Sequence, residues 1–130
     1  MIVNAQTAAE IIDELGLQPY RDGVYRGVEP SCIGLHLLVG DGFLPWHKHH
    51  TDITWNWQGG ATCVATLSSN GHDASATNLS PQAPTLFAAA ETWMTLVSLG
   101  QWSLLAQTPL SDTHCVTFAD SDWYPRPRSS

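Results

Sequence analysis

The densest group of side chains capable of chemistry lies between residues 42 and 60 and includes His47 and His49. If this segment is a β-strand, both imidazoles point to the same face, because side chains alternate along a strand. Two imidazoles about 7 Å apart along a strand can share a divalent metal ion or flank a substrate as acid and base. Trp46 adjoins the pair, which favours a small-molecule pocket over a solvated run of histidines.

Two kinds of chemistry are open to these histidines. A metal site for oxygen chemistry needs two histidines and a carboxylate, which Glu91 or Asp52 can supply, although Asp52 suits a turn in which it caps backbone N–H groups. Without a metal, His47 or His49 can act as base and Glu91 as acid, since a carboxyl group buried among tryptophans has a raised pKa. Such a pair suffices for epimerisation, tautomerisation or isomerisation, and an aromatic wall can also position an apolar substrate for cyclisation.

The elements that position these residues are one helix and many short strands. Thr7 and Glu10 form a capping-box pattern, which predicts a helix over residues 7–16 that ends at Gly16. The later pattern predicts strands at residues 31–39, 54–58, 61–68, 77–79, 85–88, 93–99, 103–107 and 115–118, with a hairpin at Ser69-Asn70-Gly71 and a turn at Gly100-Gln101. Short strands at this spacing indicate a β-sandwich or barrel, followed by a tail over residues 119–130 that is loose or crosses a neighbouring subunit.

The composition limits the class of partner. The chain has 130 residues, the length of one domain, with a formal net charge of −7 and only five Lys and Arg residues. A nucleic-acid binder needs a basic surface to neutralise phosphates, and an anionic membrane repels a chain of this charge, so neither partner is expected. A neutral, aromatic or cationic small molecule is the expected ligand, consistent with the six tryptophans.

The N-terminal residues, the lack of a long apolar run and the cysteines indicate the cellular compartment. The first residues lack the basic region and apolar core of a signal peptide, and no apolar run approaches the ~20 residues of a membrane span. The three cysteines are an odd number at wide spacings, which is typical of reduced, buried thiols. The sequence therefore predicts a cytoplasmic protein in which Cys32, Cys63 and Cys115 are neither disulfide-bonded nor zinc ligands.

Several short motifs occur together in a fixed order. They are Leu15-Gly16-Leu17-Gln18-Pro19, Asp22-Gly23-Val24-Tyr25, Trp46-His47, Thr51-Asp52, Trp55, Gly60, Asn70-Gly71, Trp93 and Leu99-Gly100-Gln101-Trp102-Ser103-Leu104. In this order the chain resembles the cupin-5 family over about residues 8–118. The resemblance implies an all-β cupin fold, a double-stranded β-helix or jelly-roll barrel over residues 31–118 after one short helix. It also implies a homodimer and a pocket at the mouth of the barrel.

At the site, several residues of this chain differ from those usual in the family. An acid and a second inward-facing histidine of the family are replaced here by Ile53 and Asn56, and Glu91 stands where glycine is usual. Asn56 is then expected to face inward, with Trp55 and Trp57 packed outward against the second sheet or a dimer partner. Loss of the acid and one histidine is typical of a cupin that has lost its metal, so no cofactor is favoured.

The substrate-binding candidates come from several segments. Tyr25 and Arg26 match a family segment near the pocket rim, while on its own strand either His36 or its leucine neighbours face the barrel. The full set of candidates is His36, Trp46, Asn56, Trp93, Tyr25 and Arg26, beside the catalytic candidates His47, His49 and Glu91, which are also the ligands expected of any metal.

The function predicted from the sequence is a metal-independent isomerase, epimerase or cyclase of specialised metabolism that acts on a neutral, apolar or aromatic molecule. One alternative is a metal-dependent dioxygenase or lyase that uses His47 and His49. The other alternative is a non-catalytic small-molecule-binding protein.

Overall fold

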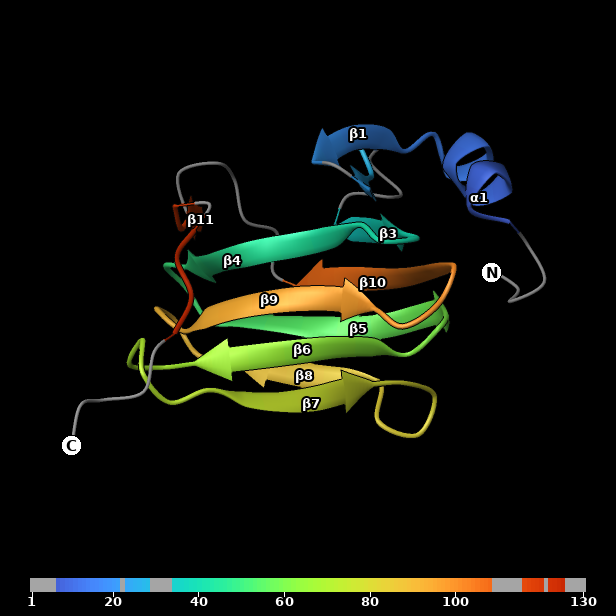
Figure 1. Cartoon of the computed structure of the whole chain (residues 1–130). Helices are drawn as coiled ribbons and strands as arrows, with labels where there is room; N and C mark the ends of the chain where they lie inside the picture. The colour runs from blue at the N-terminus through green and yellow to red at the C-terminus, as the bar shows by residue number, and fades with distance from the viewer. Residues whose placement is uncertain (1–6, 22, 29–33, 109–115, 121, 126–130) are drawn as a thin grey trace.

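A computed structural model describes residues 7–21, 23–28, 34–108, 116–120 and 122–125, and these form two antiparallel sheets and a short helix (Figure 1). The first sheet contains, in spatial order, β1 (Gln18–Arg21), β2 (Val24–Arg26), β3 (Leu35–Val39), β10 (Trp102–Thr108), β5 (Ile53–Gly60) and β8 (Thr85–Ala88). The second contains β11 (Val116–Phe118), β4 (Phe43–His49), β9 (Trp93–Ser98), β6 (Cys63–Ser68) and β7 (Ser75–Leu79). Strands distant in sequence are neighbours in both sheets, and the predicted jelly-roll barrel is confirmed.

The helix α1 (Ala8–Leu15) has the predicted ends. Thr7 Oγ1 accepts a hydrogen bond from the Glu10 backbone N–H at 3.2 Å, and Glu10 Oε1 accepts one from the Thr7 N–H at 2.8 Å. Gly16 ends the helix at φ 63°, a left-handed conformation that glycine adopts without strain. None of the described helical segments is both long enough and apolar enough to cross a bilayer.

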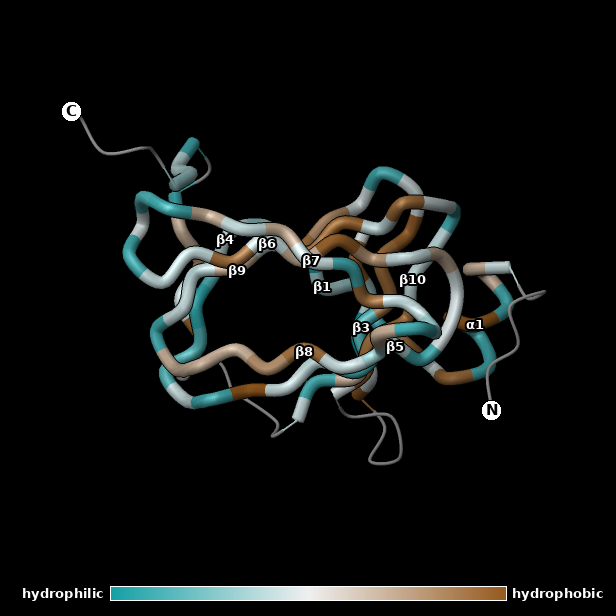
Figure 2. Tube along the Cα trace, turned by 90° about the horizontal axis from the view of Figure 1, so that it is seen from below, coloured by the Kyte–Doolittle hydropathy of each residue, from teal (hydrophilic) through white to brown (hydrophobic). Residues whose placement is uncertain are grey.

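Two apolar clusters lie on opposite faces of the first sheet. Alternate residues of β3 and β10 point to opposite sides, so Leu37 and Leu104 pack against Ile11 of α1, whereas Leu38 and Leu105 point between the sheets. Figure 2 shows α1 outside the sheets, beside β3 and β10. The cluster between the sheets contains Val24, Leu38, Leu44, Ile53, Trp55, Cys63, Ala65, Leu79, Ala88, Met94, Leu96 and Leu105. This space between the sheets is called the barrel interior below.

Several local predictions are confirmed, and others need revision. β6 and β7 form the predicted hairpin, although β7 begins at Ser75 rather than at residue 77. β1, β2 and β4 were not among the predicted strands. Pro19 and the few residues of β1 and β2 leave no alternating pattern, and in β4 Pro45 and the break in register beside it interrupt the alternation. Cys63 is a buried free thiol, as predicted, and burial raises its pKa to about 12. Cys32 and Cys115 lie outside the described residues.

Candidate functional site

A β-bulge in β4 decides which of its side chains enter the barrel. Leu44 lies opposite Leu96 of β9, and His47 lies opposite Met94, so Pro45 and Trp46 together oppose the single residue Thr95. The extra residue reverses the alternation, so that His47 rather than Trp46 shares the inner face with Leu44. The Thr95 hydroxyl fixes the bulge by donating to the Leu44 carbonyl at 2.6 Å.

His47 and His49 occupy the inner face together, as the strand spacing predicts. Their side chains are almost fully buried, and their ring centroids lie 5.1 Å apart with planes at 81°. Phe118 is the register partner of His47 on β11 and places its ring 5.2 Å from the imidazole. This edge strand therefore covers His47 with an aromatic ring.

The first sheet presents a second group of rings to the same interior. His36 of β3 lies 5.1 Å from the buried ring of Trp55, measured between centroids, and 6.0 Å from Tyr20. Tyr20 in turn lies 6.2 Å from Phe118, so these two side chains join the edges of the two sheets. The group formed by Tyr20, His36, His47, His49, Trp55 and Phe118 is called the inner cluster.

The hydrogen bonds of the inner cluster determine which nitrogen of His47 carries its proton. His47 Nδ1 lies 2.7 Å from the Pro45 carbonyl oxygen, which can only accept, so Nδ1 carries the hydrogen and Nε2 holds a lone pair. Nε2 is buried and has no hydrogen-bond partner within the described part of the chain, and the same is true of the indole nitrogen of Trp55. Buried polar atoms without partners are rare in folded proteins, so these two atoms indicate a place for a further molecule.

The three histidines of the inner cluster are neutral near pH 7. Burial lowers the pKa of His47 to about 3, outweighing the opposing effect of its hydrogen bond to Pro45. Burial likewise lowers the pKa of His36 to about 4 and that of His49 to about 4. Each protonated ring would also repel its neighbours, and the positive charge of Arg26 disfavours protonation of His36.

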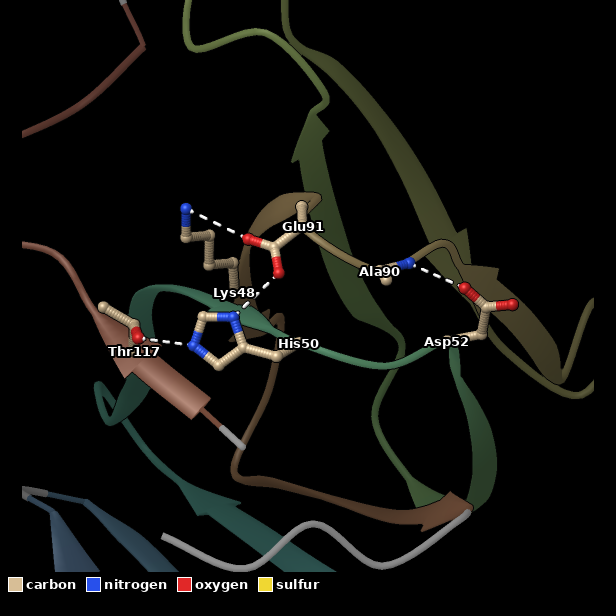
Figure 3. Close-up of polar contacts among 6 residues, drawn as sticks. All are labelled: Lys48, His50, Asp52, Ala90, Glu91 and Thr117. Atoms are coloured by element: carbon tan, nitrogen blue, oxygen red, sulfur yellow. Dashed lines mark hydrogen bonds and ion pairs between the residues drawn. The ribbon is translucent and has the colours of Figure 1, made fainter. Parts of the chain in front are cut away.

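Glu91 lies on the other side of β4. Its carboxylate contacts Lys48 Nζ at 3.2 Å and His50 Nδ1 at 2.8 Å, and His50 Nε2 lies 2.8 Å from the Thr117 hydroxyl (Figure 3). Lys48 and His50 alternate with the inner histidines, so the predicted grouping of Glu91 with His47 and His49 is not formed. The expectation of a raised carboxyl pKa is also wrong, because hydrogen bonds from His50 and Lys48 lower the pKa of Glu91.

The described residues do not fit a metal centre with two histidines and a carboxylate. No group of three His, Cys, Asp or Glu side chains within them is arranged to hold a metal ion. Asp52 accepts a hydrogen bond from the Ala90 backbone N–H at 2.8 Å (Figure 3), so it binds a backbone N–H as predicted, but one distant in the sequence rather than in its own turn. His47 and His49 would therefore need a third ligand from elsewhere.

Asn56 faces the opposite way from the prediction. Trp55 and Trp57 both belong to the cluster between the sheets, whereas the Asn56 side-chain oxygen accepts a hydrogen bond from the Thr85 hydroxyl at 2.9 Å, away from the interior. Burying two indole rings removes far more apolar area from water than burying one amide, which explains this choice of face.

The remaining candidates divide between two regions. Arg26 places its guanidinium carbon 4.2 Å from the centroid of the Tyr20 ring, and it pairs in register with His36, next to the inner cluster. Tyr25 packs instead with the cluster under α1. Trp46 and Trp93 lie on the outer side of β4 and β9, where both contact Trp123, a residue that the sequence placed only in a tail.

Comparison with known proteins identifies the fold. No family model matches the sequence, and no curated protein matches it. Among solved structures, protein SO0799 from Shewanella oneidensis aligns with 88% of this chain and 85% of its own at 16% identity and a TM-score of 0.72. A hypothetical protein from Leishmania major aligns with 86% of each chain at 12% identity and a TM-score of 0.62. The chain has the cupin fold.

A further similar structure is larger. CapF, solved with the inhibitor 3-isopropenyl-tropolone, aligns over 80% of this chain but only 34% of its own, at 12% identity and a TM-score of 0.58. At these identities the likeness extends to the cupin fold alone. The inner cluster lies in the interior of this cupin barrel, and its members Tyr20, Trp55 and Phe118 were not among the predicted site residues, because only the paired sheets bring them together.

Proposed function

We propose that the chain is a small-molecule-binding cupin of the cupin-5 type, with its ligand in the barrel interior against the inner cluster. The unpartnered, buried Nε2 of His47 is the observation that carries the proposal. Because Nδ1 donates its hydrogen to the Pro45 carbonyl, Nε2 carries the lone pair and can accept a hydrogen bond from an O–H or N–H group of a ligand. The indole N–H of Trp55 supplies a complementary donor.

The character of the interior favours a neutral ligand. His36, His47 and His49 are uncharged near pH 7, and the surrounding side chains are aromatic or aliphatic. An ion placed there would lose its hydration, and the positive charges of Arg21 and Arg26, which act on His47 and His36, would in addition repel a cation. A neutral, apolar or aromatic molecule that carries a hydroxyl or amide group fits these constraints.

Within the predicted class of isomerases, epimerases and cyclases, the proposed reaction is one that positioning alone can promote, a cyclisation of one substrate to one product without a metal. A base with a pKa of about 3 takes up a proton poorly at neutral pH, since acid–base catalysis works best when the pKa is close to the working pH. His47 therefore contributes by orienting the substrate through a hydrogen bond, and the aromatic walls restrict its shape. A cytoplasmic homodimer acting on such a substrate belongs to the same proposal.

A fragment screen by nuclear magnetic resonance tests the proposal. The protein is labelled with ¹⁵N in histidine and tryptophan side chains and titrated with neutral aromatic alcohols and amides. Binding fragments are expected to shift the ring signals of His47 and Trp55. His47→Leu is expected to weaken the affinity for these fragments about fivefold, since one hydrogen bond contributes about 1 kcal/mol.

The matched control is Lys48→Gln on the outer face of the same strand, which should bind these fragments as the wild type does. Treatment with a chelator should leave fragment binding unchanged, whereas its loss would favour the metal-dependent alternative. The proposal is wrong if no fragment perturbs the inner cluster, or if His47→Leu binds the fragments with unchanged affinity.

A further inference from the structure

A concave site lies where β4, the end of β1 and the segment that follows β11 meet. This outer cleft has a volume of about 380 Å³ and is lined by Arg21, Phe43, Pro45, Trp46, Phe118, Ala119, Asp120 and Trp123. Its size falls in the range of about 300–1,000 Å³ that is typical of small-molecule sites.

The walls of the outer cleft are aromatic and held in place by ring contacts. Trp46 and Trp123 meet edge to face, with centroids 5.7 Å apart. Trp123 also packs on Trp93 at 4.6 Å, with the planes inclined by 38°. The Ala119 backbone N–H donates to the Trp46 carbonyl at 2.9 Å, which holds the segment after β11 against β4. These contacts preorganise two indole rings to receive a flat apolar group.

The outer cleft also contains one charge of each sign. The guanidinium carbon of Arg21 lies 3.4 Å from the centroid of the Phe118 ring, a contact that leaves the N–H groups at the edge of the guanidinium available to a carboxylate. The Asp120 carboxylate makes no hydrogen bond or ion pair with another described residue, although the Asp120 carbonyl accepts from the Trp123 N–H at 2.9 Å. Arg21 and Asp120 therefore line one cleft without forming an ion pair with each other within the described structure.

We propose that the outer cleft binds a small zwitterion with an aromatic body, of the chemical class of aromatic α-amino acids. The ligand carboxylate pairs with Arg21, its ammonium group pairs with Asp120, and its ring packs on Trp46 and Trp123. A simple anion would meet Asp120 and the overall charge of −7, while a simple cation would meet Arg21, so only the zwitterion matches both groups.

This inference stands apart from the proposed function. Phe118 is the one side chain common to both regions, since its ring lines the outer cleft and also contacts His47. Arg21, Asp120 and Trp123 do not belong to the inner cluster. Arg21 packs on Phe118 and its charge acts on His47, so Asp120→Asn is the variant of the cleft that is compared with His47→Leu.

The test uses three probes with the same ring and different charges: L-phenylalanine, 3-phenylpropionate and 2-phenylethylamine. Binding is followed by isothermal titration calorimetry and by quenching of tryptophan fluorescence, since two tryptophans line the cleft. L-Phenylalanine is expected to bind about tenfold more tightly than either singly charged probe, because charge-assisted hydrogen bonds are about twice as strong as neutral ones.

Two substitutions assign the charges. Arg21→Gln should weaken the binding of phenylalanine and phenylpropionate about tenfold, and it should strengthen the binding of phenylethylamine because the repelling positive charge is removed. Asp120→Asn should weaken the binding of phenylalanine and phenylethylamine, and it should strengthen the binding of phenylpropionate because the repelling negative charge is removed. Arg21 and Asp120 are exposed, so both variants should fold, which circular dichroism verifies.

Matched controls are Asp13→Asn, an exposed carboxylate on α1, and His47→Leu in the barrel interior; both should bind phenylalanine as the wild type does. Equal affinity for the three probes, or no binding of phenylalanine at 10 mM, overturns the proposal. Loss of phenylalanine binding in His47→Leu together with unchanged binding in Asp120→Asn also overturns it, because the ligand would then lie in the interior rather than in the cleft.

Discussion

The two faces of β4 place chemically similar residues in opposite surroundings. On the inner face, His47 is buried and neutral, and its Nε2 has no partner among the described residues. On the outer face, His50 lies between the Glu91 carboxylate and the Thr117 hydroxyl, with both ring nitrogens hydrogen-bonded. One histidine is left with an unused acceptor, and the other has its hydrogen-bonding capacity filled by the protein.

The difference shows that the type of a residue predicts chemistry only after its face is known. The bulge at Pro45 and Trp46 decides which side chains of β4 face inward. A histidine on the inner face is buried, which lowers its pKa, whereas a histidine on the outer face meets a carboxylate. The inner face is therefore equipped for an external ligand, while the outer histidine connects β11 to the turn before β9.

The largest expected effect compares neighbouring apolar residues on the two faces. Leu44 is 2% exposed and Phe43 is 49% exposed. Leu44→Ala should lower the free energy of unfolding by about 2–5 kcal/mol, because it opens a cavity between the sheets. Phe43→Ala should lower it by less than about 1 kcal/mol. Urea denaturation measures both, and similar losses would contradict the assignment of faces.

A smaller effect is expected from acid. The pKa of His47 is about 3 in the folded protein and 6.5 when unperturbed, so between these values the unfolded chain binds a proton that the folded chain does not. Stability is therefore constant above about pH 6.5 and falls below it, by about 1.4 kcal/mol per pH unit for each such histidine.

Urea denaturation at several pH values between 4 and 8 measures this slope. His47→Leu should reduce the slope by the contribution of one proton, and Lys48→Gln on the outer face should leave it unchanged. A slope that is the same in His47→Leu as in the wild type would show that His47 is not the buried neutral group described above.

The smallest effect is expected at Glu91, on the outer face. Hydrogen bonds from His50 and Lys48 lower its pKa, so its contribution is present above its unperturbed pKa of 4.5 and is lost as the pH falls through the lower folded value. Glu91→Gln should slightly lower the midpoint temperature at low salt. The loss should become smaller at 1 M salt, where the screening length is about 3 Å.

Glu91→Gly is the sharper comparison, because Glu91 has φ 66°, a backbone conformation that favours glycine. Relief of this strain should offset the lost contacts, so Glu91→Gly should melt no lower than Glu91→Gln. Thermal denaturation followed by circular dichroism measures both, and a glycine variant that melts well below the glutamine variant would contradict the account of strain.

The sequence predicted the parts of the fold that depend on local patterns. The capping box at Thr7 and Glu10 and the strand alternation in residues 61–68 are encoded within a few residues, and all were confirmed. The common face of His47 and His49 was predictable for the same reason, since their spacing of two holds for any strand.

The predictions that failed depended on relations between strands. Glu91 and Asn56 were placed by analogy, but a bulge in β4 and the burial of Trp55 reversed what their positions suggested. Trp123 and Phe118 carried no local signal, because each gains its neighbours only when the segment around β11 pairs with β4.

By itself, the sequence determined a mainly β-stranded chain with one capped helix, a negative net charge that disfavours nucleic acid, and a pair of histidines on one face of a strand. Only the tertiary structure decided which face enters the barrel, which histidine meets a carboxylate and which aromatic rings surround the others. The physical reason is that strand periodicity is a local property, whereas burial and pairing depend on contacts between residues far apart in the chain.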